Sequence, residues 1–234
     1  MNTQKKYKHS LFKKSFSLLL FSVFFTKPCL GMPFFPVHQK NTIIMLCPAG
    51  DAKNPGRTLT AGYERGQTFR FAEQLQQKLS QHYGFQTIIA RKPGYYSTNL
   101  QTASFANQLS CNFFLKIHIY KENIVKPQIY MYHHVYNPLT DSTLKSFSAY
   151  DFIPLHLAHT CNICTSKAIG DKIKTSLSKD TKKFDCYGPY GIPLVSLVGI
   201  LAPALLIEIG IDQDNKWQTM IDEITQSLHV LVDL

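Results

Sequence analysis

Residues 203–211 read Pro-Ala-Leu-Leu-Ile-Glu-Ile-Gly-Ile, an apolar run that contains a single carboxylate, Glu208. Unbroken apolar runs of this length are typical of strands that are covered on both faces of a sheet. Burying a carboxylate in such a strand costs several kcal/mol unless it is paired, protonated or close to a metal. The alternative is a strand-end carboxylate bonded to backbone amides. Either way, the run predicts a core strand, and Glu208 becomes a candidate functional residue.

Two other segments follow the same pattern. The apolar segment 42–46 leads into Cys-Pro-Ala-Gly-Asp at 47–51, and the segment 112–120 contains His118. Glu64 stands at the start of a helical pattern. In open α/β sheets, functional residues gather outside the carboxyl ends of the strands. Taken alone, His118 is a candidate core histidine, and Glu64 is an acid of the kind favoured at helix starts; together with Glu208 they suggest a site.

Strand and helix patterns alternate along the chain, which has 234 residues, the size of one α/β domain. We expect strands at 42–46, 86–90, 112–120, 129–136, 194–198 and 204–209, and helices at 63–83, 99–110, 164–177 and 217–233. This alternation predicts an α/β fold with a mostly parallel twisted sheet and helices on both faces.

The first 31 residues differ from the rest in charge and hydropathy. They contain six lysines and no acidic residue, and an apolar run extends from Phe16 to Phe25. This pattern is typical of a secretory signal peptide, and the run is short for a membrane span. We therefore expect a signal peptide at 1–31, a spacer at 32–40 and a catalytic domain at 41–234, with an uncleaved anchor as the alternative. The expected location is the periplasm or cell envelope, without a stable membrane span after cleavage.

The overall charge does not favour nucleic acid as a partner. The formal net charge is +10, but removing the six lysines of the signal segment leaves 19 basic against 15 acidic residues. That balance describes an ordinary solvated surface. The 44% content of hydrophobic residues argues against disorder. The sequence is thus that of a folded exported protein without nucleic-acid binding.

Several segments resemble one known family in order and spacing. The family's Asp-Pro-Gly-His-Gly-Gly turn appears as Cys-Pro-Ala-Gly-Asp-Ala at 47–52, and its helix-starting glutamate as Glu64. Its Ser-Ile-His-Ala-Asn strand appears as Lys-Ile-His-Ile-Tyr at 116–120, and its Pro-Ala-Val-Leu-Val-Glu-x-Gly-Phe segment as 203–211. From residue 43 to about residue 214, the chain is therefore similar to the zinc-dependent N-acetylmuramoyl-L-alanine amidases.

The resemblance implies a reaction and a site. The reaction is hydrolysis of the amide bond between N-acetylmuramic acid and L-alanine in peptidoglycan, which would be the partner. By this resemblance, Glu64 and His118 are ligands of a Zn²⁺ cofactor, and Glu208 is the catalytic base. The zinc ion of such sites activates a water molecule and polarises the carbonyl group that the water attacks.

One departure from the family pattern concerns the metal. Gly50 stands where the family has its first ligand histidine, and the loss of one ligand weakens zinc binding severely. Asp51, the next residue, is the substitute ligand that we predict. A set of Asp51, Glu64 and His118 would also suit a harder divalent metal such as Mn²⁺. A second hypothesis is therefore a catalytically degenerate amidase fold that binds peptidoglycan or regulates hydrolases.

The cysteines suggest a third function. An exported chain with six cysteines is a candidate for disulfides, and we expect Cys186 to pair with Cys161 or Cys164. The neighbouring His156 and His159 leave a structural metal site as an alternative. An exported metal or redox protein centred on these cysteines is the corresponding functional hypothesis.

Overall fold

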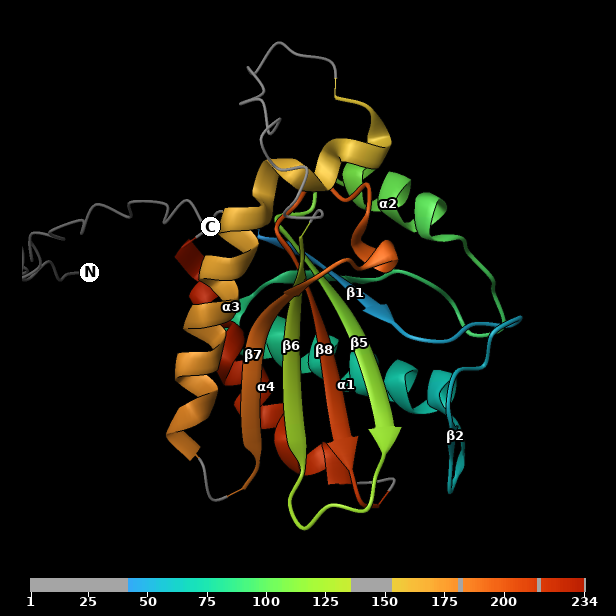
Figure 1. Ribbon diagram of the computed structural model, residues 1–234, viewed down its shortest axis with the longest axis vertical. Coiled ribbons are helices and arrows are strands. Elements are labelled where there is room, and N and C mark those ends of the chain that lie inside the picture. The colour runs from blue at the N-terminus through green and yellow to red at the C-terminus, as the bar shows by residue number, and fades with distance from the viewer. Residues whose placement is uncertain (1–41, 136–152, 181–182, 214–215, 234) are drawn as a thin grey trace, which may run out of the picture. The chain divides into compact units, whose positions relative to one another are not determined.

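The computed structural model describes residues 42–135, 153–180, 183–213 and 216–233 (Figure 1). They form an α/β domain around a central sheet. The expected signal peptide and spacer lie outside the described residues, as does Tyr136 at the end of one expected strand.

Six strands form the central sheet, in the order β4-β1-β5-β8-β6-β7. Their bounds are β1 Ile43–Pro48, β4 Gln86–Ile89, β5 Phe113–Lys121, β6 Gln128–His134, β7 Asp185–Ile192 and β8 Ala204–Ile211. Strands β4, β1, β5 and β8 are parallel, whereas β6 is antiparallel to β8 and parallel to β7. The expected mostly parallel sheet is confirmed. A small hairpin, β2 (Thr58–Leu59) and β3 (Gly62–Tyr63), lies outside it.

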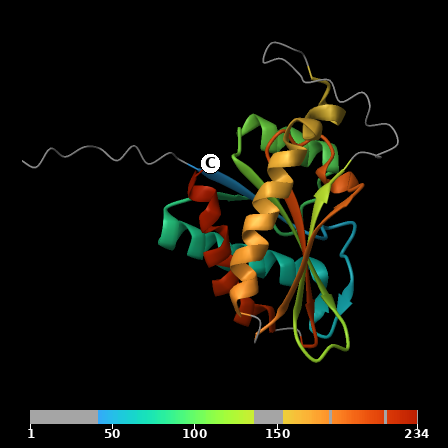
Figure 2. The same ribbon diagram turned by 60° about the vertical axis from the view of Figure 1, so that its left-hand side comes forward.

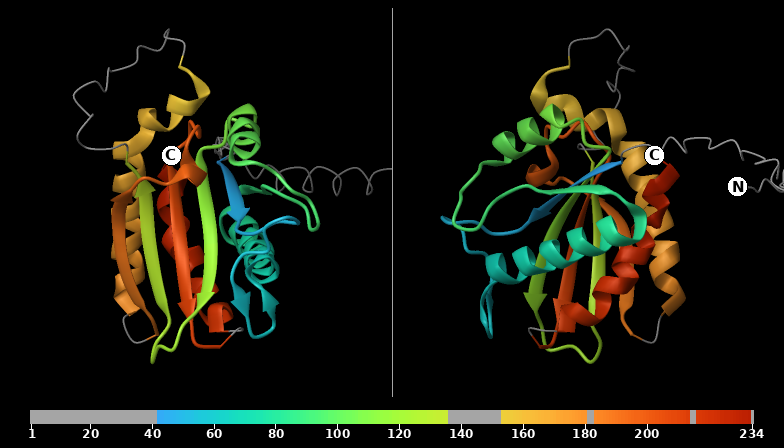
Figure 3. Two further views of the ribbon diagram at one scale, coloured as in Figure 1. Left: turned by 45° about the vertical axis from the view of Figure 1, so that its right-hand side comes forward. Right: turned by 180° about the vertical axis from the view of Figure 1, so that it is seen from behind.

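Helices lie on both faces of the sheet, as expected. The α-helices are α1 Glu64–Tyr83, α2 Asn99–Gln108, α3 Ile163–Leu177 and α4 Ile221–Ser227. The 3₁₀ segments are η2 Leu155–Asn162, η3 Ser178–Asp180, η4 Val195–Leu197, η5 Lys216–Met220 and η6 Leu228–Asp233. Helices α1, α3 and α4 cover one face (Figures 2 and 3), and α2 lies with η4 on the other. No helix in the described part of the chain is long and apolar enough to cross a membrane.

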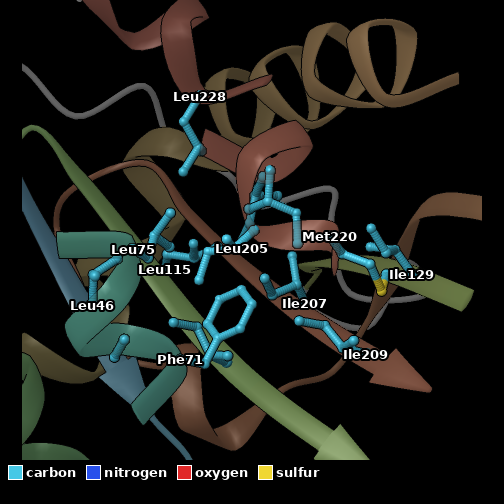
Figure 4. Close-up of a cluster of buried hydrophobic side chains, with 14 of the residues drawn as sticks. Leu46, Phe71, Leu75, Leu115, Ile129, Leu205, Ile207, Ile209, Met220 and Leu228 are labelled. Carbon is cyan, nitrogen blue, oxygen red and sulfur yellow. The ribbon is translucent and has the colours of Figure 1, made fainter. Parts of the chain in front are cut away.

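The main core lies between the sheet and helices α1, α3 and α4 (Figure 4). Every second residue of β5 and β8 points into it, for example Leu115 and Leu205, which are fully buried. From the helix side, Phe71 packs edge-on against Trp217, with 5.6 Å between the ring centroids. Burial of each large apolar side chain stabilises the fold by roughly 1.5–3 kcal/mol. This core fixes β5 and β8 side by side.

The second face of the sheet is covered over only part of its length. Near the amino ends of β5 and β8, Phe114 and Leu206 are buried together with Ala103 of α2 and Leu197 of η4. Towards the carboxyl ends, no helix of the described residues lies in front of this face (Figure 1). The side chains that the strands present there are therefore only partly buried, and they are polar or aromatic.

Two of the expected elements differ in the structure. The apolar segment 194–198, expected as a strand, is the 3₁₀ turn η4, which is followed by Gly199 in the left-handed conformation (φ 86°). The expected helix at 217–233 is divided into η5, α4 and η6. Strand β7 was not expected, because its sequence Asp-Cys-Tyr-Gly-Pro-Tyr-Gly-Ile lacks the usual strand composition.

The expected disulfide is not formed. Cys161, Cys164 and Cys186 are all free thiols, and the first two are exposed to solvent. Burial raises the pKa of the Cys186 thiol to about 11, so this group is a poor nucleophile at neutral pH. Within the described ranges, no three His, Cys, Asp or Glu side chains are grouped so as to hold a metal ion. The alternative of a structural metal site at these cysteines is therefore wrong for the described residues.

A pair of buried histidines connects β6 to η2. The rings of His134 and His159 meet edge to face, with 4.3 Å between their centroids. His159 accepts a hydrogen bond from the Gly199 amide at Nδ1, and its buried Nε2 has no partner within the described residues. Burial, together with the charges that His134 and His156 would carry, lowers the pKa of His159 to about 4.

This low pKa predicts a loss of stability in mild acid. As the pH falls, the unfolded state takes up a proton near pH 6.5, well before the folded state does. The free energy of unfolding should decrease between about pH 6.5 and about pH 4, by on the order of 2 kcal/mol for this group. In His159→Asn, the amide oxygen can still accept the Gly199 hydrogen bond but does not titrate. Urea unfolding at both ends of this range should show a weaker pH dependence for the variant; an equal dependence would contradict the prediction.

Candidate active site at the strand ends

His118 and Glu208 lie next to each other at the carboxyl ends of β5 and β8. They are direct neighbours in the parallel register of the two strands, so their side chains emerge on the same face. That face is the one left open by the helices, and the side chains are 26% and 22% exposed, respectively. The sequence-based expectation that these two residues meet at the strand ends agrees with their positions.

Glu64, the first residue of α1, reaches the same place from the side of the helix. Glu64 is only 2% exposed, and both of its carboxylate oxygens accept hydrogen bonds. Oε1 lies 2.8 Å from His118 Nδ1 and accepts from the Ile119 amide at 3.2 Å. Oε2 accepts from the Arg57 amide at 3.0 Å. Burial works to raise the pKa of Glu64, but the hydrogen bonds and charges of His118 and Arg57 hold it below its usual value.

A turn of the loop before β2 packs directly on this carboxylate. The Arg57 amide donates to Glu64 Oε2, and the Glu64 amide donates to the Arg57 carbonyl at 2.8 Å. Gly56 has a positive φ of 78°, and a Cβ atom there would lie 2.6 Å from Glu64 Oε2. Only glycine fits at this close approach. The backbone of Arg57 is thus held in a fixed position beside Glu64.

The side chain of Arg57 extends from this turn to Glu208. Its Nη2 donates to Glu208 Oε1 at 2.8 Å, and its guanidinium carbon lies 5.1 Å from the centroid of the Tyr120 ring. Burial works to lower the pKa of Arg57, but the hydrogen bond and charge of Glu208, followed by the charge of Glu64, raise it. Arg57 therefore stays positively charged, with its guanidinium against the Glu208 carboxylate and the Tyr120 ring.

Tyrosines border the site on its other side. On β6 and β7, Tyr130 stacks on Tyr187 with 4.8 Å between the centroids, and Tyr132 lies 6.0 Å from Tyr190. Tyr130 is also the register neighbour of Glu208. Burial, and then the charge and hydrogen bond of Glu208, raise the pKa of Tyr132. The Tyr132 phenol is consequently neutral at physiological pH. The rings of the four tyrosines give the open face an aromatic border.

Asp51, the predicted substitute ligand, is used differently. Its Oδ1 accepts the amide hydrogens of Lys53 and Asn54, both at 2.8 Å, and so closes a local turn. Asp51 does not belong to any group of three potential ligands within the described residues. The structure brings Glu64 and His118 into contact but does not add Asp51 to them.

Gly50 cannot be replaced simply by a ligand residue. Its φ of 72° is a left-handed conformation, and an added Cβ atom would lie 2.6 Å from the Cβ of Arg65 and 2.9 Å from the Pro55 carbonyl oxygen. The loop is thus packed around the absence of a side chain. A histidine at this position would need a different loop conformation.

The donor set does not fit a zinc ion, although the family resemblance implies one. A catalytic zinc site has three protein ligands and an open position for water. The described residues supply Glu64 and His118, which are bonded to each other, and no third ligand converges on them. The carboxylate of Glu208, which neighbours His118 on this face, is already paired with the guanidinium group of Arg57.

The fold and these strand-end residues define an α/β protein with a candidate functional site at the carboxyl edge of the sheet. The sequence profile of the N-acetylmuramoyl-L-alanine amidases matches residues 44–228, and the chain belongs to this family. No curated protein matches the sequence.

Solved structures of amidases share the fold. The catalytic domain of CwlV, an N-acetylmuramoyl-L-alanine amidase from Bacillus (Paenibacillus) polymyxa var. colistinus, is 14% identical with a TM-score of 0.58, over 82% of this chain and 96% of that one. An N-acetylmuramoyl-L-alanine amidase of Clostridium difficile 630 is 17% identical with a TM-score of 0.58, over 82% and 97%. The amidase Ami1 of Mycobacterium smegmatis is 13% identical with a TM-score of 0.55, over 82% and 97%.

Sequence reasoning did not find Arg57 or the tyrosine border. Arg57 lies in an irregular loop, where no periodicity indicates which way a side chain points. Its position after Pro55 and Gly56 is typical of a turn and carries no further signal. The positions of Tyr130 and Tyr132 could have been predicted, because residues two apart in a strand lie on the same face. Those of Tyr187 and Tyr190 could not, because strand β7 was not expected.

The packing at Gly50 predicts the effect of adding one methyl group. We expect Gly50→Ala to lower the free energy of unfolding by about 1–3 kcal/mol, because of backbone strain and the contacts with Arg65 and Pro55. The matched control is Gly66→Ala in α1, where an added Cβ atom meets nothing within 4 Å. That change should stabilise the protein by about 0.5–1 kcal/mol. Urea unfolding measures both; equal effects of the two changes would contradict the described loop.

Proposed function

We propose that the chain acts on peptidoglycan and hydrolyses the amide bond between N-acetylmuramic acid and L-alanine. Membership of the amidase family supports peptidoglycan amidase activity. The observation that carries the proposal is the position of His118, which lies beside Glu208 on the open face at the strand ends and is bonded to the buried Glu64. The order of these residues along the chain is that of the family's site. The tyrosine border offers an extended surface beside Glu208 for a polymeric substrate.

In this proposal, Glu208 is the general base. It removes a proton from a water molecule whose oxygen bonds to the amide carbon, and it returns that proton to the nitrogen as the carbon–nitrogen bond breaks. Arg57 lies beside Glu208 and would stabilise the negative charge that develops on the carbonyl oxygen. Glu64 holds the imidazole of His118 in place at the other side of the site.

A second candidate is peptidoglycan binding without turnover. It is favoured by the ion pair between Arg57 and Glu208, because the guanidinium already takes one of the oxygens to which a water molecule would transfer its proton. The absence of a third metal ligand within the described residues points in the same direction. Such a protein would retain the open face and its tyrosines as a binding surface.

Either function requires the chain to meet peptidoglycan outside the cytoplasm. The basic and apolar segment at 1–31 supports export through a signal peptide. We therefore propose a location in the periplasm or cell envelope. Release of labelled mature protein from cells by osmotic shock would test it, and a purely cytoplasmic fraction would contradict it.

Digestion of purified sacculi separates the two candidates. The wild-type chain should release stem peptides with a free L-alanine amino group, detected by mass spectrometry. Glu208→Gln keeps the shape of the side chain but cannot accept the proton, and we expect a rate at least about 100-fold lower. Glu73→Gln, on the exposed side of α1, is the matched control and should leave the rate unchanged.

Co-sedimentation with intact sacculi completes the experiment. Binding by both wild type and Glu208→Gln, without any release of stem peptides by the wild type, supports the second candidate and excludes the first. If the wild type neither binds sacculi nor releases stem peptides, both candidate functions are rejected. Release that is the same in wild type and Glu208→Gln would reject Glu208 as the base.

A further inference from the structure

The backbone of Arg57 is held in place by hydrogen bonds and close packing, although the residue lies in an irregular loop. Its backbone exchanges two hydrogen bonds with Glu64, at 3.0 Å and 2.8 Å. The adjoining Gly56 leaves no room for a side chain against the Glu64 carboxylate. Arg65 holds the same loop from the other side, since its amide donates to the Pro55 carbonyl at 3.0 Å. The starting point of the Arg57 side chain is thereby fixed.

The far end of this side chain is equally well defined. The guanidinium donates to Glu208 at 2.8 Å and lies over the Tyr120 ring. Tyr120 can lie there because Gly210 has no side chain: a Cβ atom at Gly210 would be 2.7 Å from the tyrosine hydroxyl oxygen. One carboxylate and one aromatic face therefore contact the positive charge, while the second carboxylate, Glu64, holds the backbone of the same residue.

The charges of these groups explain why a cation is needed here. Glu64 is buried and Glu208 is partly buried; Glu64 is hydrogen-bonded to His118, and Glu208 is its neighbour in the strand register. Two carboxylates in a partly desolvated site repel each other unless a positive charge lies between them. In a metal site, the ion supplies this charge. Here the charge of Arg57 acts on both carboxylates.

We propose that Arg57 is the resident cation of this site and takes the charge-balancing place that the family gives to a metal ion. Glu64 fixes the backbone of Arg57, Tyr120 supports its guanidinium, and Glu208 is its partner. The site is then complete without a divalent metal. This inference rests on the proposed function for the location of the site, but it holds whether or not the chain turns over its substrate.

Metal content gives the first test. The full chain is incubated with excess zinc, passed through a desalting column and analysed for bound metal by elemental analysis. We expect far less than one zinc per chain, and the same low content after His118→Ala. Stoichiometric zinc in the wild type that disappears in His118→Ala would overturn the proposal.

A double-mutant cycle gives the second test, with the urea unfolding equilibrium as the readout. Arg57→Met keeps the apolar stem without the charge, and Glu208→Gln keeps the shape of the acid. We expect the two effects to be coupled by about fivefold in the unfolding equilibrium constant, which is a typical size for partly exposed ion pairs. Arg57→Lys, which keeps the charge, should restore part of this coupling.

The matched control is Arg70→Met, on the exposed side of α1. It should show no coupling with Glu208→Gln. High salt should reduce the coupling of Arg57 but leave the control unchanged. Additive effects of Arg57→Met and Glu208→Gln would reject Arg57 as the cation of the site.

The sacculus assay links this inference to the function. Whatever binding or hydrolysis the wild type shows should survive a chelator such as EDTA and should weaken in Arg57→Met but not in Arg70→Met. Activity that EDTA abolishes and zinc restores would overturn the proposal. If the chain neither binds nor cleaves peptidoglycan, the proposed function fails, while metal content and the cycle still decide the role of Arg57.

Discussion

The buried carboxylate of Glu64 is the constraint on which the rest of the site depends. An unpaired carboxylate at this depth would cost several kcal/mol. The protein satisfies it with donors from distant segments: the Arg57 amide from a loop, and the Ile119 amide and His118 imidazole from β5. These hydrogen bonds to Glu64 hold together the start of α1, the loop before β2 and the end of β5. The position of the Arg57 side chain, and so its contact with Glu208, follows from the same bonds.

The fold could be predicted wherever apolar periodicity is strong. Strands β1, β5 and β8 are covered on both faces near their amino ends, and their apolar segments indicated them correctly. Strand β7 was not predicted because it lies at the edge of the sheet. The backbone groups on its outer side need no partner strand there, and Pro189 is tolerated. The segment 194–198 has the composition of a strand, but Gly199 turns the chain directly after it. Composition alone therefore predicts neither the edge strand β7 nor the 3₁₀ turn at 194–198.

The site could be predicted only where regular elements carry it. His118 and Glu208 are at strand ends, and Glu64 is at a helix start, so alternation and order along the chain were sufficient to place them. Asp51 was chosen for its proximity in sequence to Gly50, but its carboxylate closes a turn with Lys53 and Asn54. Arg57 depends on loop conformation, which no periodic pattern encodes. The resemblance to the family indicated that the ligand histidine is missing at position 50, but it did not indicate the cation of Arg57.

The left-handed conformation of Gly50 has a consequence for any attempt to build a metal site in this chain. Its loop has closed around a position without a side chain, with Arg65 and Pro55 in the space that a ligand would enter. A single codon change to histidine would meet that packing, and Arg57 would still hold Glu208. Introducing a third metal ligand at position 50 would therefore require changes in the surrounding loop and at Arg57 as well.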